Sequence, residues 1–466
     1  MTPEEFRRIG HEVVDWIADY RERIEQFPVR SQVEPGWVRS QLPAELPEQG
    51  SGFDGVLSDL DRIVLPATTH WQHPSFFAYF PANASLPSVL GDLLSTGLGV
   101  QGMLWSTSPA CTELEQALLD QLAVAMGLPE AFLGGGVIQD TASSAALVAL
   151  LAALHRSSGG KWRESGVDSS ETVYVSSQTH SSLAKAARMA GLGEESLRSV
   201  DVVPDTLEMS AEALEELIRS DVDAGRRPVM VCATIGTTGT GAVDPVRRIA
   251  EICARYGIWL HVDAAWAGSA ALCPEWRHLF DGVELADSYS SNAHKWLLTA
   301  FDCCLFWTRH PGTLVDALSI LPDYLRNAAS ESGAVVDYRD WQIPLGRRFR
   351  ALKLWTVLRW YGLAGLRDHL RGHVELASRL ESWIAGDERF ELAVPRSLAL
   401  VCLRLRAGDA ATRAVMDRIN AEGRAFLTHT TINGKFVIRV AIGSVGTEER
   451  HVRALWDGLR AAADAV

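Results

Sequence analysis

Apolar residues recur at helical spacing near the start of the chain. They form one face of a predicted helix, made of Phe6, Ile9, Val13, Ile17 and Tyr20. Thr2 and Glu5 provide a capping box, and Pro3 suits the first helical position. A proline-rich stretch then runs to about residue 47 and indicates an extended connector. One helix and a connector cannot bury an apolar face alone, so this arm must pack on something larger. A partner subunit is one candidate.

Between about residues 85 and 310, short apolar runs alternate with helical patterns. The runs that we expect to be strands span 172–177, 228–236, 258–265 and 287–291. Between the second and third runs, Asp244 and Pro245 are expected to start a helix that Gly257 ends. This alternation predicts an α/β domain with a mostly parallel sheet covered on both faces. Ligands in such sheets bind beyond the carboxyl ends of the strands.

The last hundred residues follow a different pattern. A strand is expected over 398–405 and a helix over 410–421, followed by a hairpin of 426–431 and 436–442. Asn433-Gly434 accepts the positive φ of a type I′ turn between those strands. A helix over about 448–463, capped by Thr447, is expected to close the chain. We therefore predict an N-terminal helical arm and connector (1–84), a large α/β domain (85–355) and a small α+β domain (356–466).

The composition excludes several classes of protein. Hydrophobic residues make up 47% and charged residues 22% of 466 positions, as in a folded globular protein. The net charge is −14 and no basic stripe is present, so no nucleic-acid partner is expected. The acidic start lacks the features of a signal peptide and no apolar run can span a bilayer, so we expect a cytoplasmic protein without a membrane partner. Seven scattered cysteines predict reduced, mostly buried thiols and no metal site.

Small residues precede an alanine-rich segment near residue 140. Gly134, Gly135 and Gly136 are followed after a few positions by Ala142 and Ser143, at the start of a predicted helix. Small side chains let backbone N–H groups approach an anion, and a helix start favours negative charge. The pattern indicates either a phosphate cup or a tight packing turn.

Three chemically capable side chains follow predicted strands. Asp263 is placed either to hold a protonated ring nitrogen or to act as a cap or ion-pair partner. Lys295 is placed to form a Schiff base if it is desolvated, or to cover apolar surface with its stem. His180 can stack on a planar ring or move a proton, or bond within its own loop. Two other lysines, Lys185 and Lys353, have the spacing of helix surfaces and are not expected to react.

Taken together, these motifs meet the requirements of one cofactor. An anion site, a strand-end aspartate and a lysine 32 positions after it are what pyridoxal phosphate needs. The anion site holds its phosphate, the carboxylate pairs with its ring nitrogen, and the lysine binds its aldehyde. We therefore predict pyridoxal 5′-phosphate as the cofactor.

Longer stretches of the chain resemble the group II pyridoxal-phosphate decarboxylases, and within them the aromatic-L-amino-acid decarboxylases. The matching stretches are residues 69–71, 76–81, 105, 108–115, 136–139, 261–265, 267–270, 294–298, 337–338 and 341–350. The resemblance implies an aspartate-aminotransferase-like fold (PLP fold type I) and a homodimer with shared active sites. It also implies decarboxylation of an aromatic L-amino acid, of the tryptophan, phenylalanine, tyrosine or dihydroxyphenylalanine type, to an amine and CO₂.

The resemblance further implies roles for individual residues. Lys295 would hold the cofactor covalently, Asp263 would pair with its ring nitrogen, and His180 would stack on the ring face opposite Ala265. Tyr324, on a loop from the partner subunit, would donate a proton to the product with help from His180. The remaining expected cofactor contacts are Ala142, Ser143, Asn292, His294 and Thr238. The expected substrate-binding residues are Trp71, Tyr79, Phe80, Pro81, Ala82, Gln101, Met103, Leu104 and Gly346.

The chain departs from the usual family pattern at some of these positions. Asp140 stands where glycine is usual beside the phosphate cup, and Ala82 replaces a common threonine. Three alternatives stay open: an aldehyde synthase on the same scaffold, an aminotransferase that binds a carboxylate through Arg439, and a non-catalytic binding protein. The presence of both Tyr324 and His180 favours decarboxylation over aldehyde formation.

Overall fold

The computed structural model describes residues 1–320 and 334–466. Two compact units make up this part of the chain. The terminal unit consists of Met1–Pro81, Arg379–Ala393 and Leu403–Val466, and the central unit consists of Ala82–Ser378 and Val394–Cys402. The division into three domains expected from the sequence stays a prediction.

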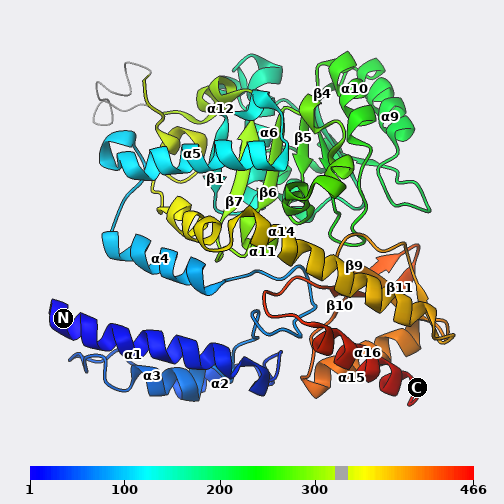
Figure 1. Cartoon of the computed structure of the whole chain (residues 1–466). Helices are drawn as coiled ribbons and strands as arrows, with labels where there is room; N and C mark the ends of the chain where they lie inside the picture. Colours follow the sequence, from blue (N-terminus) through cyan, green and yellow to red (C-terminus); the bar gives the residue numbers. More distant parts are fainter. Residues whose placement is uncertain (321–333) are drawn as a thin grey trace. The chain divides into compact units, whose positions relative to one another are not determined.

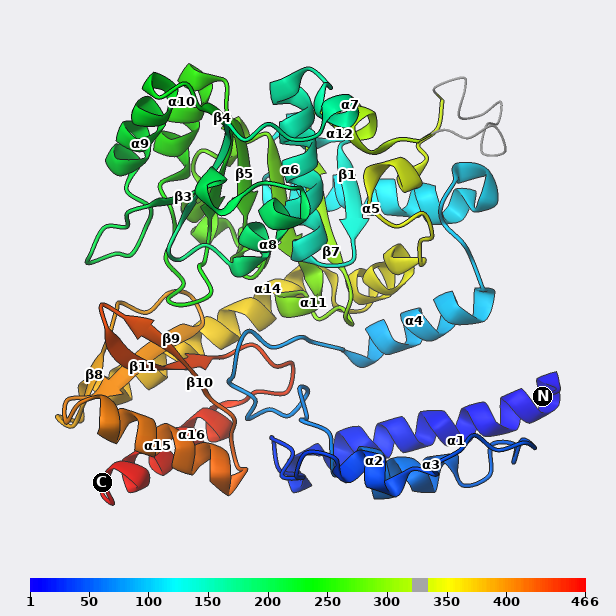
Figure 2. The ribbon, with the colours of Figure 1, turned by 180° about the vertical axis from the view of Figure 1, so that it is seen from behind.

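A seven-stranded sheet forms the middle of the central unit (Figures 1 and 2), with the strand order β1-β7-β6-β5-β4-β2-β3. Its strands are β1 (Gly136–Gln139), β2 (Glu171–Ser176), β3 (Leu197–Val200), β4 (Arg227–Thr234), β5 (Trp259–Asp263), β6 (Ser288–Asn292) and β7 (Cys304–Thr308). Adjacent strands from β3 to β6 pair in parallel, and β7 runs antiparallel to both of its neighbours. The predicted mostly parallel sheet is therefore confirmed, and all four strands expected from the sequence are present.

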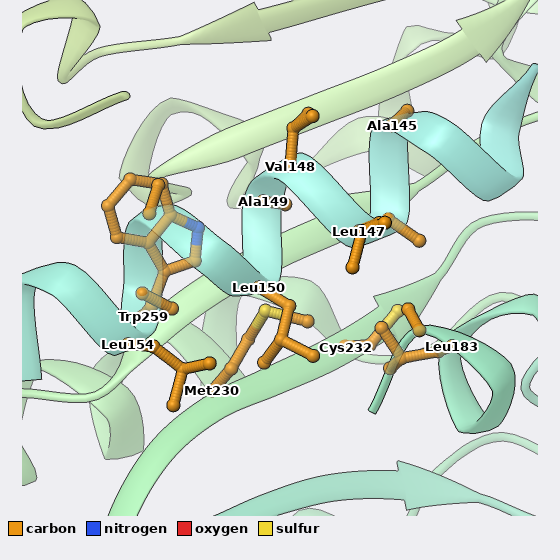
Figure 3. Close-up of a cluster of buried hydrophobic side chains, with 14 of the residues drawn as sticks. Ala145, Leu147, Val148, Ala149, Leu150, Leu154, Leu183, Met230, Cys232 and Trp259 are labelled. Carbon is orange, nitrogen blue, oxygen red and sulfur yellow. The ribbon is translucent and has the colours of Figure 1, made fainter. Parts of the chain in front are cut away.

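Helices cover both faces of this sheet. The helices of the central unit are α4 (Leu86–Leu98), α5 (Pro109–Met126), α6 (Ala142–Ser158), α7 (Trp162–Ser165), α8 (Ser181–Met189), α9 (Ala211–Asp223), α10 (Val246–Tyr256), α11 (Ala293–Trp296), α12 (Pro311–Leu318) and α14 (Arg350–Ala385). α6 and α8 pack together on one face, whereas α9 and α10 lie against the other, as right-handed crossovers require (Figure 2). Figure 3 shows α6 in the core, where its alanines and leucines pack on Met230, Cys232 and Trp259 of the sheet.

The terminal unit contains both ends of the chain. Its helices are α1 (Pro3–Glu22), α2 (Trp37–Gln41), α3 (Val56–Asp59), α15 (Asp409–Glu422) and α16 (Glu449–Ala463). A second sheet has the order β10-β11-β9-β8, formed by β8 (Phe390–Leu392), β9 (Leu400–Leu405), β10 (Thr428–Ile432) and β11 (Lys435–Ala441). The capping box of α1 is confirmed, as is the hairpin turn, in which Asn433 and Gly434 have φ of 48° and 76°.

Two predicted helix caps and one predicted surface residue are wrong. Asp244 does not cap α10, which begins at Val246 after Pro245; its buried carboxylate accepts from the backbone N–H groups of Met209 and Thr234 instead. Thr447 does not cap α16, because Glu448 takes that position. Lys353 is fully buried in α14 and pairs with Asp92 at 3.4 Å.

All seven cysteines are buried and unpaired. Their burial opposes the charged thiolate, which raises the pKa of Cys273 to about 11 and that of Cys111 to about 12. The predicted buried thiols are thus confirmed, and the folded chain keeps them in their unreactive form.

Candidate active site

The predicted cofactor residues gather at the carboxyl edge of the central sheet. β4, β5 and β6 are adjacent parallel strands, and Thr234, Asp263 and Ser290 lie side by side at their ends. Further predicted residues follow β1, β2, β4, β5 and β6 in the chain. These residues are Ala142 and Ser143 after β1, His180 after β2, Thr238 after β4, Ala265 after β5, and Asn292, His294 and Lys295 at and after the end of β6.

Asp263 is the last residue of β5 and is 9% exposed. Its Oδ1 accepts from the backbone N–H of Ala265 at 2.9 Å, which fixes the orientation of the carboxylate. Its Oδ2 has no hydrogen-bond partner in the part of the chain that the structure describes. One carboxylate oxygen can therefore accept from a protonated ring nitrogen.

Lys295 lies in α11, a single turn that is held on two sides. Asn83 donates from its backbone N–H to the carbonyl of His294 at 2.8 Å, and from its side-chain amide to the carbonyl of Lys295. On the other side, the Trp296 indole stacks on Trp266 at 5.1 Å between ring centroids. These contacts fix the backbone from which the half-buried lysine side chain extends.

His294 is buried beside that lysine. Its Nδ1 accepts from the backbone N–H of Cys303 at 3.0 Å. Burial, reinforced by the charge of Lys295, lowers the pKa of His294 to about 3. The imidazole is therefore neutral at pH 7 and adds no positive charge to a phosphate site.

His180 precedes α8 as its N-cap residue. Its Nδ1 accepts from the backbone N–H of Ser182 at 3.1 Å, so the neutral ring carries its proton on Nε2. Desolvation lowers the pKa of His180, with Lys295 acting in the same direction and Asp263 opposing it. Asp263 and Lys295 are thus both within electrostatic reach of His180, and the histidine is a neutral donor.

The N-terminus of α6 has the donors that a phosphate needs. Its N-cap residue Thr141 makes no side-chain capping bond, so the first N–H groups of this 17-residue helix are open to an anion beside Ala142 and the exposed Ser143. The buried side-chain amide of Asn292 has an oxygen without a partner among the described residues. Buried polar groups are ordinarily hydrogen-bonded, so this amide is available to a ligand, and after a rotation of about 180° its NH₂ group would be the donor that a phosphate oxygen accepts. These residues fit pyridoxal phosphate.

Thr238 is exposed in the turn that follows β4. The neighbouring Thr237 is buried and holds this turn, with its hydroxyl 3.1 Å from that of Thr240 and accepting from the N–H of Ala242 at 3.0 Å. The turn therefore presents Thr238 from a fixed backbone.

The predicted substrate residues fall in both units. Trp71, Tyr79, Phe80 and Pro81 belong to the terminal unit, whereas Ala82, Gln101, Met103, Leu104 and Gly346 belong to the central unit. Within the central unit, the Gln101 Oε1 accepts from the N–H groups of Met103 and Arg347, both at 3.0 Å. A Cβ placed on Gly346 would lie 3.3 Å from the Gln101 Nε2, so these residues are neighbours. Tyr324 lies outside the described residues.

The terminal unit gives Arg439 a structural position. The guanidinium is 3% exposed, lies 5.1 Å above the Phe80 ring, and donates to the carbonyl of Tyr79 and the hydroxyl of Thr428. These contacts hold it within the fold and argue against the alternative of a carboxylate-binding arginine.

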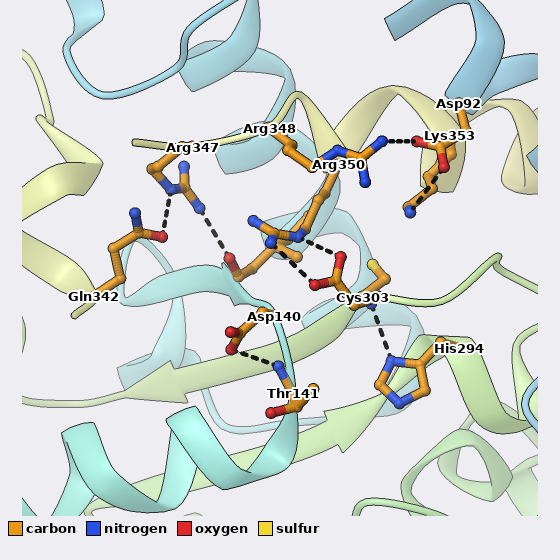
Figure 4. Close-up of polar contacts among 12 residues, drawn as sticks. Asp92, Asp140, Thr141, His294, Cys303, Gln342, Arg347, Arg348, Arg350 and Lys353 are labelled. Carbon is orange, nitrogen blue, oxygen red and sulfur yellow. Dashed lines mark hydrogen bonds and ion pairs between the residues drawn. The ribbon is translucent and has the colours of Figure 1, made fainter. Parts of the chain in front are cut away.

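A row of cations near the start of α14 was not predicted from the sequence (Figure 4). Arg347 makes a fully buried ion pair with Glu115 at 2.8 Å and donates to the carbonyl of Ile138 in β1. Arg350 binds both carboxylate oxygens of Asp302, one residue before Cys303. The spacing Arg-Arg-x-Arg within the motif 341–350 was the available signal, and its acidic partners are far away in sequence.

Two other features bear on the kind of protein. Within residues 1–320 and 334–466, no His, Cys, Asp and Glu side chains are grouped as the ligands of a metal ion. No helix in that part of the chain is both long and apolar enough to cross a membrane.

Comparison with known proteins identifies the family. A model of the pyridoxal-dependent decarboxylase conserved domain matches residues 35–406. The chain belongs to the pyridoxal-dependent decarboxylase family. The predicted cofactor, pyridoxal 5′-phosphate, is confirmed with it.

Individual relatives within this decarboxylase family cover nearly the whole chain. Phenylacetaldehyde synthase of Arabidopsis thaliana is 47% identical over 98% of this chain and 95% of its own. Tryptophan decarboxylase 2 of Oryza sativa is 46% identical over 99% and 95%. The crystal structure of Oryza sativa TDC with PLP and tryptamine has a TM-score of 0.96 and 42% identity, over 100% and 99% of the two chains. The predicted fold type I architecture is confirmed, and the chain belongs to the aromatic amino acid decarboxylase branch of its family.

Proposed function

We propose that this decarboxylase converts an aromatic L-amino acid to the corresponding aromatic amine and CO₂. The observation that carries the proposal is the meeting of Asp263, Lys295 and His180 at one edge of the central sheet. The phosphate donors at α6 stand at the same edge. Relatives named for tryptophan and tyrosine decarboxylation support the aromatic substrate class.

Each of these residues has a distinct task. When bound, the cofactor supplies an electron sink for the electrons of the bond between Cα and the carboxylate. Asp263 keeps a proton on the ring nitrogen through its free Oδ2. Lys295 would hold the cofactor covalently through its amine. Asn292 and the first turn of α6 hold the phosphate.

Proton delivery to Cα decides the product. After CO₂ leaves, one proton must reach Cα, and we assign it to the Tyr324 hydroxyl. His180 would lie against the cofactor ring, and it holds its own proton on Nε2, so it could orient or replenish that donor. A phenol keeps its proton at neutral pH, since its unperturbed pKa is ~10.

The second candidate is an aromatic aldehyde synthase, which consumes dioxygen and water and releases aldehyde, CO₂, ammonia and hydrogen peroxide. Phenylacetaldehyde synthase of Arabidopsis thaliana is 47% identical to this chain, so overall similarity does not separate the two activities. The presence of Tyr324 together with His180 favours the amine. A catalytically silent relative is disfavoured, because Lys295 and Asp263 are intact.

We infer that the enzyme is a homodimer in which Tyr324 reaches the partner's site. α4 presents a row of exposed leucines, and exposed apolar patches of this kind mark association surfaces. The leucines are Leu86, Leu90, Leu93, Leu94 and Leu98, each between 46% and 63% exposed. On α1, the predicted apolar face keeps Phe6 59% exposed. A cytoplasmic location stays a prediction.

Product analysis tests the proposed reaction. The purified enzyme, saturated with pyridoxal phosphate, is given tryptophan, phenylalanine, tyrosine or dihydroxyphenylalanine under air. Amine, aldehyde, ammonia and peroxide are measured in the same samples. Amine and CO₂ in equal amounts from at least one of these substrates support the proposal. Aldehyde, ammonia and peroxide as main products would establish the synthase, and no turnover of any substrate would refute both.

A further inference from the structure

Asp140 places a carboxylate at the positive end of α6 (Figure 4). The residue is half-buried, and its Oδ1 accepts from the backbone N–H of Thr141 at 2.7 Å. Thr141 is the N-cap residue of α6 and contributes no side-chain cap of its own. A negative charge next to a helix N-terminus is stabilising. Asp140 therefore acts as an internal anion for this helix.

The surrounding charges do not neutralise Asp140 fully. Arg350 attracts it electrostatically, yet the same guanidinium binds Asp302 through two hydrogen bonds of 2.8 and 3.1 Å. One cation thus serves two carboxylates. Lys353 pairs with Asp92, and the nearby His294 is neutral because burial lowers its pKa to about 3. Among the described residues Asp140 forms no ion pair of its own, so its negative charge stays beside the start of α6.

We propose that Asp140 weakens the binding of the cofactor phosphate by competing with it for the positive end of α6. The proposal rests on the proposed function, which puts that phosphate at the same helix N-terminus. In the cofactor-free protein, Asp140 accepts from the Thr141 N–H, and its negative charge stabilises the positive end of the helix. In the loaded protein, carboxylate and phosphate repel each other across the first turn. Asp140 thus lowers the affinity for the cofactor, stabilises the cofactor-free state and makes cofactor exchange easier.

The test compares the wild type with Asp140→Asn. The asparagine oxygen can still accept from the Thr141 N–H, so the change removes charge and little else. Cofactor-free enzyme is titrated with pyridoxal phosphate and with pyridoxal, and binding is followed by quenching of tryptophan fluorescence. The variant should bind pyridoxal phosphate at least about tenfold more tightly, the order expected for removing one charge near a dianion. Its affinity for pyridoxal should not change, and its cofactor-free form should melt at a lower temperature.

Inorganic phosphate provides a probe that is independent of the lysine. It should compete with pyridoxal phosphate more strongly in Asp140→Asn than in the wild type. Asp168→Asn is the matched control, because Asp168 also accepts from a backbone N–H, that of Ser170 at 2.8 Å, at another turn of the same unit. This control should leave both affinities unchanged. If Asp140→Asn does not fold, Asp140→Ser removes the same charge and keeps a side-chain acceptor.

Two results would overturn the proposal. One is an unchanged affinity for pyridoxal phosphate in both Asp140 variants, and the other is an equal gain for pyridoxal and pyridoxal phosphate. Failure of the proposed function looks different, because it would appear in the product analysis, as aldehyde, ammonia and peroxide or as no turnover, and not in the cofactor affinities of the Asp140 variants.

Discussion

Replacing Arg347 with methionine should destabilise the central unit strongly. The side chains of Arg347 and Glu115 are both fully buried, and the guanidinium also donates to Gln342 and to the carbonyl of Ile138. The substitution leaves the Glu115 carboxylate buried without its cation. Breaking a buried ion pair in this way costs about 3–5 kcal/mol.

The expected change in melting temperature follows from the size of the unit. At about 2.1 cal/mol/K of unfolding entropy per residue, a unit of roughly 300 residues loses about 1.6 °C for each kcal/mol. Arg347→Met should therefore lower the apparent Tm by about 5–8 °C, measured by circular dichroism at a fixed scan rate. Ile138 lies in the strand that leads to α6, so the affinity for pyridoxal phosphate should fall as well.

Two controls isolate the buried charge. The double variant Glu115→Leu, Arg347→Met removes both charges and should recover most of the lost stability. Arg255→Met removes an arginine from an exposed pair with Glu215 in the same unit and should leave the Tm unchanged within error. A Tm for Arg347→Met within about 2 °C of the wild type would show that the buried pair is not a source of stability, contrary to this reasoning.

Four further results are expected. Lys295→Ala should abolish turnover and the visible absorbance of the bound cofactor with an unchanged fold, and borohydride reduction followed by peptide mapping of the wild type should label Lys295 alone. Tyr324→Phe should convert much of the amine product to aldehyde, ammonia and peroxide under air, whereas unchanged amine yield would remove this hydroxyl from proton delivery. Mixing Lys295→Ala with Tyr324→Phe subunits should restore activity after subunit exchange, because a heterodimer holds one intact site; no recovery would count against shared sites. Burial lowers the pKa of His369 to about 4, so the unfolded chain binds this proton at a higher pH than the folded chain does. The free energy of unfolding should therefore fall by ~1.4 kcal/mol per pH unit as the pH drops from ~6.5 toward 4. His369→Gln should make the Tm less dependent on pH over that range.

The sequence predicted features that depend on short stretches of chain. The capping box at Thr2 and the Asn433-Gly434 turn involve neighbours only, so the local pattern was sufficient. The strands that deliver Asp263 and Lys295 were recognisable because each is a short apolar run next to a distinctive motif. The topology then brought these residues together, since the carboxyl ends of parallel strands share one edge.

Long-range pairing explains what the sequence did not predict. Lys353 has helical surface spacing, but Asp92 meets it in the interior from 261 positions earlier. Asp244 has the sequence position of a helix cap, but its carboxylate accepts hydrogen bonds from two backbone N–H groups of other segments. Arg347 and Glu115 pair across 232 positions. No local pattern contains the partner in any of these cases.

The buried cysteines give the enzyme a set of internal reporters of its own opening. Alkylating reagents react with thiolates that they can reach, and all seven thiols are buried, so each reacts only when the structure around it opens. Cys232 and Cys304 lie in strands of the central sheet, so their labelling rates should follow unfolding of that whole unit. Cys273 sits in a turn, and faster labelling there would report local loosening. Mass spectrometry of labelled peptides would thus give the labelling rate of each cysteine, and these rates would show in what order the regions of the chain unfold.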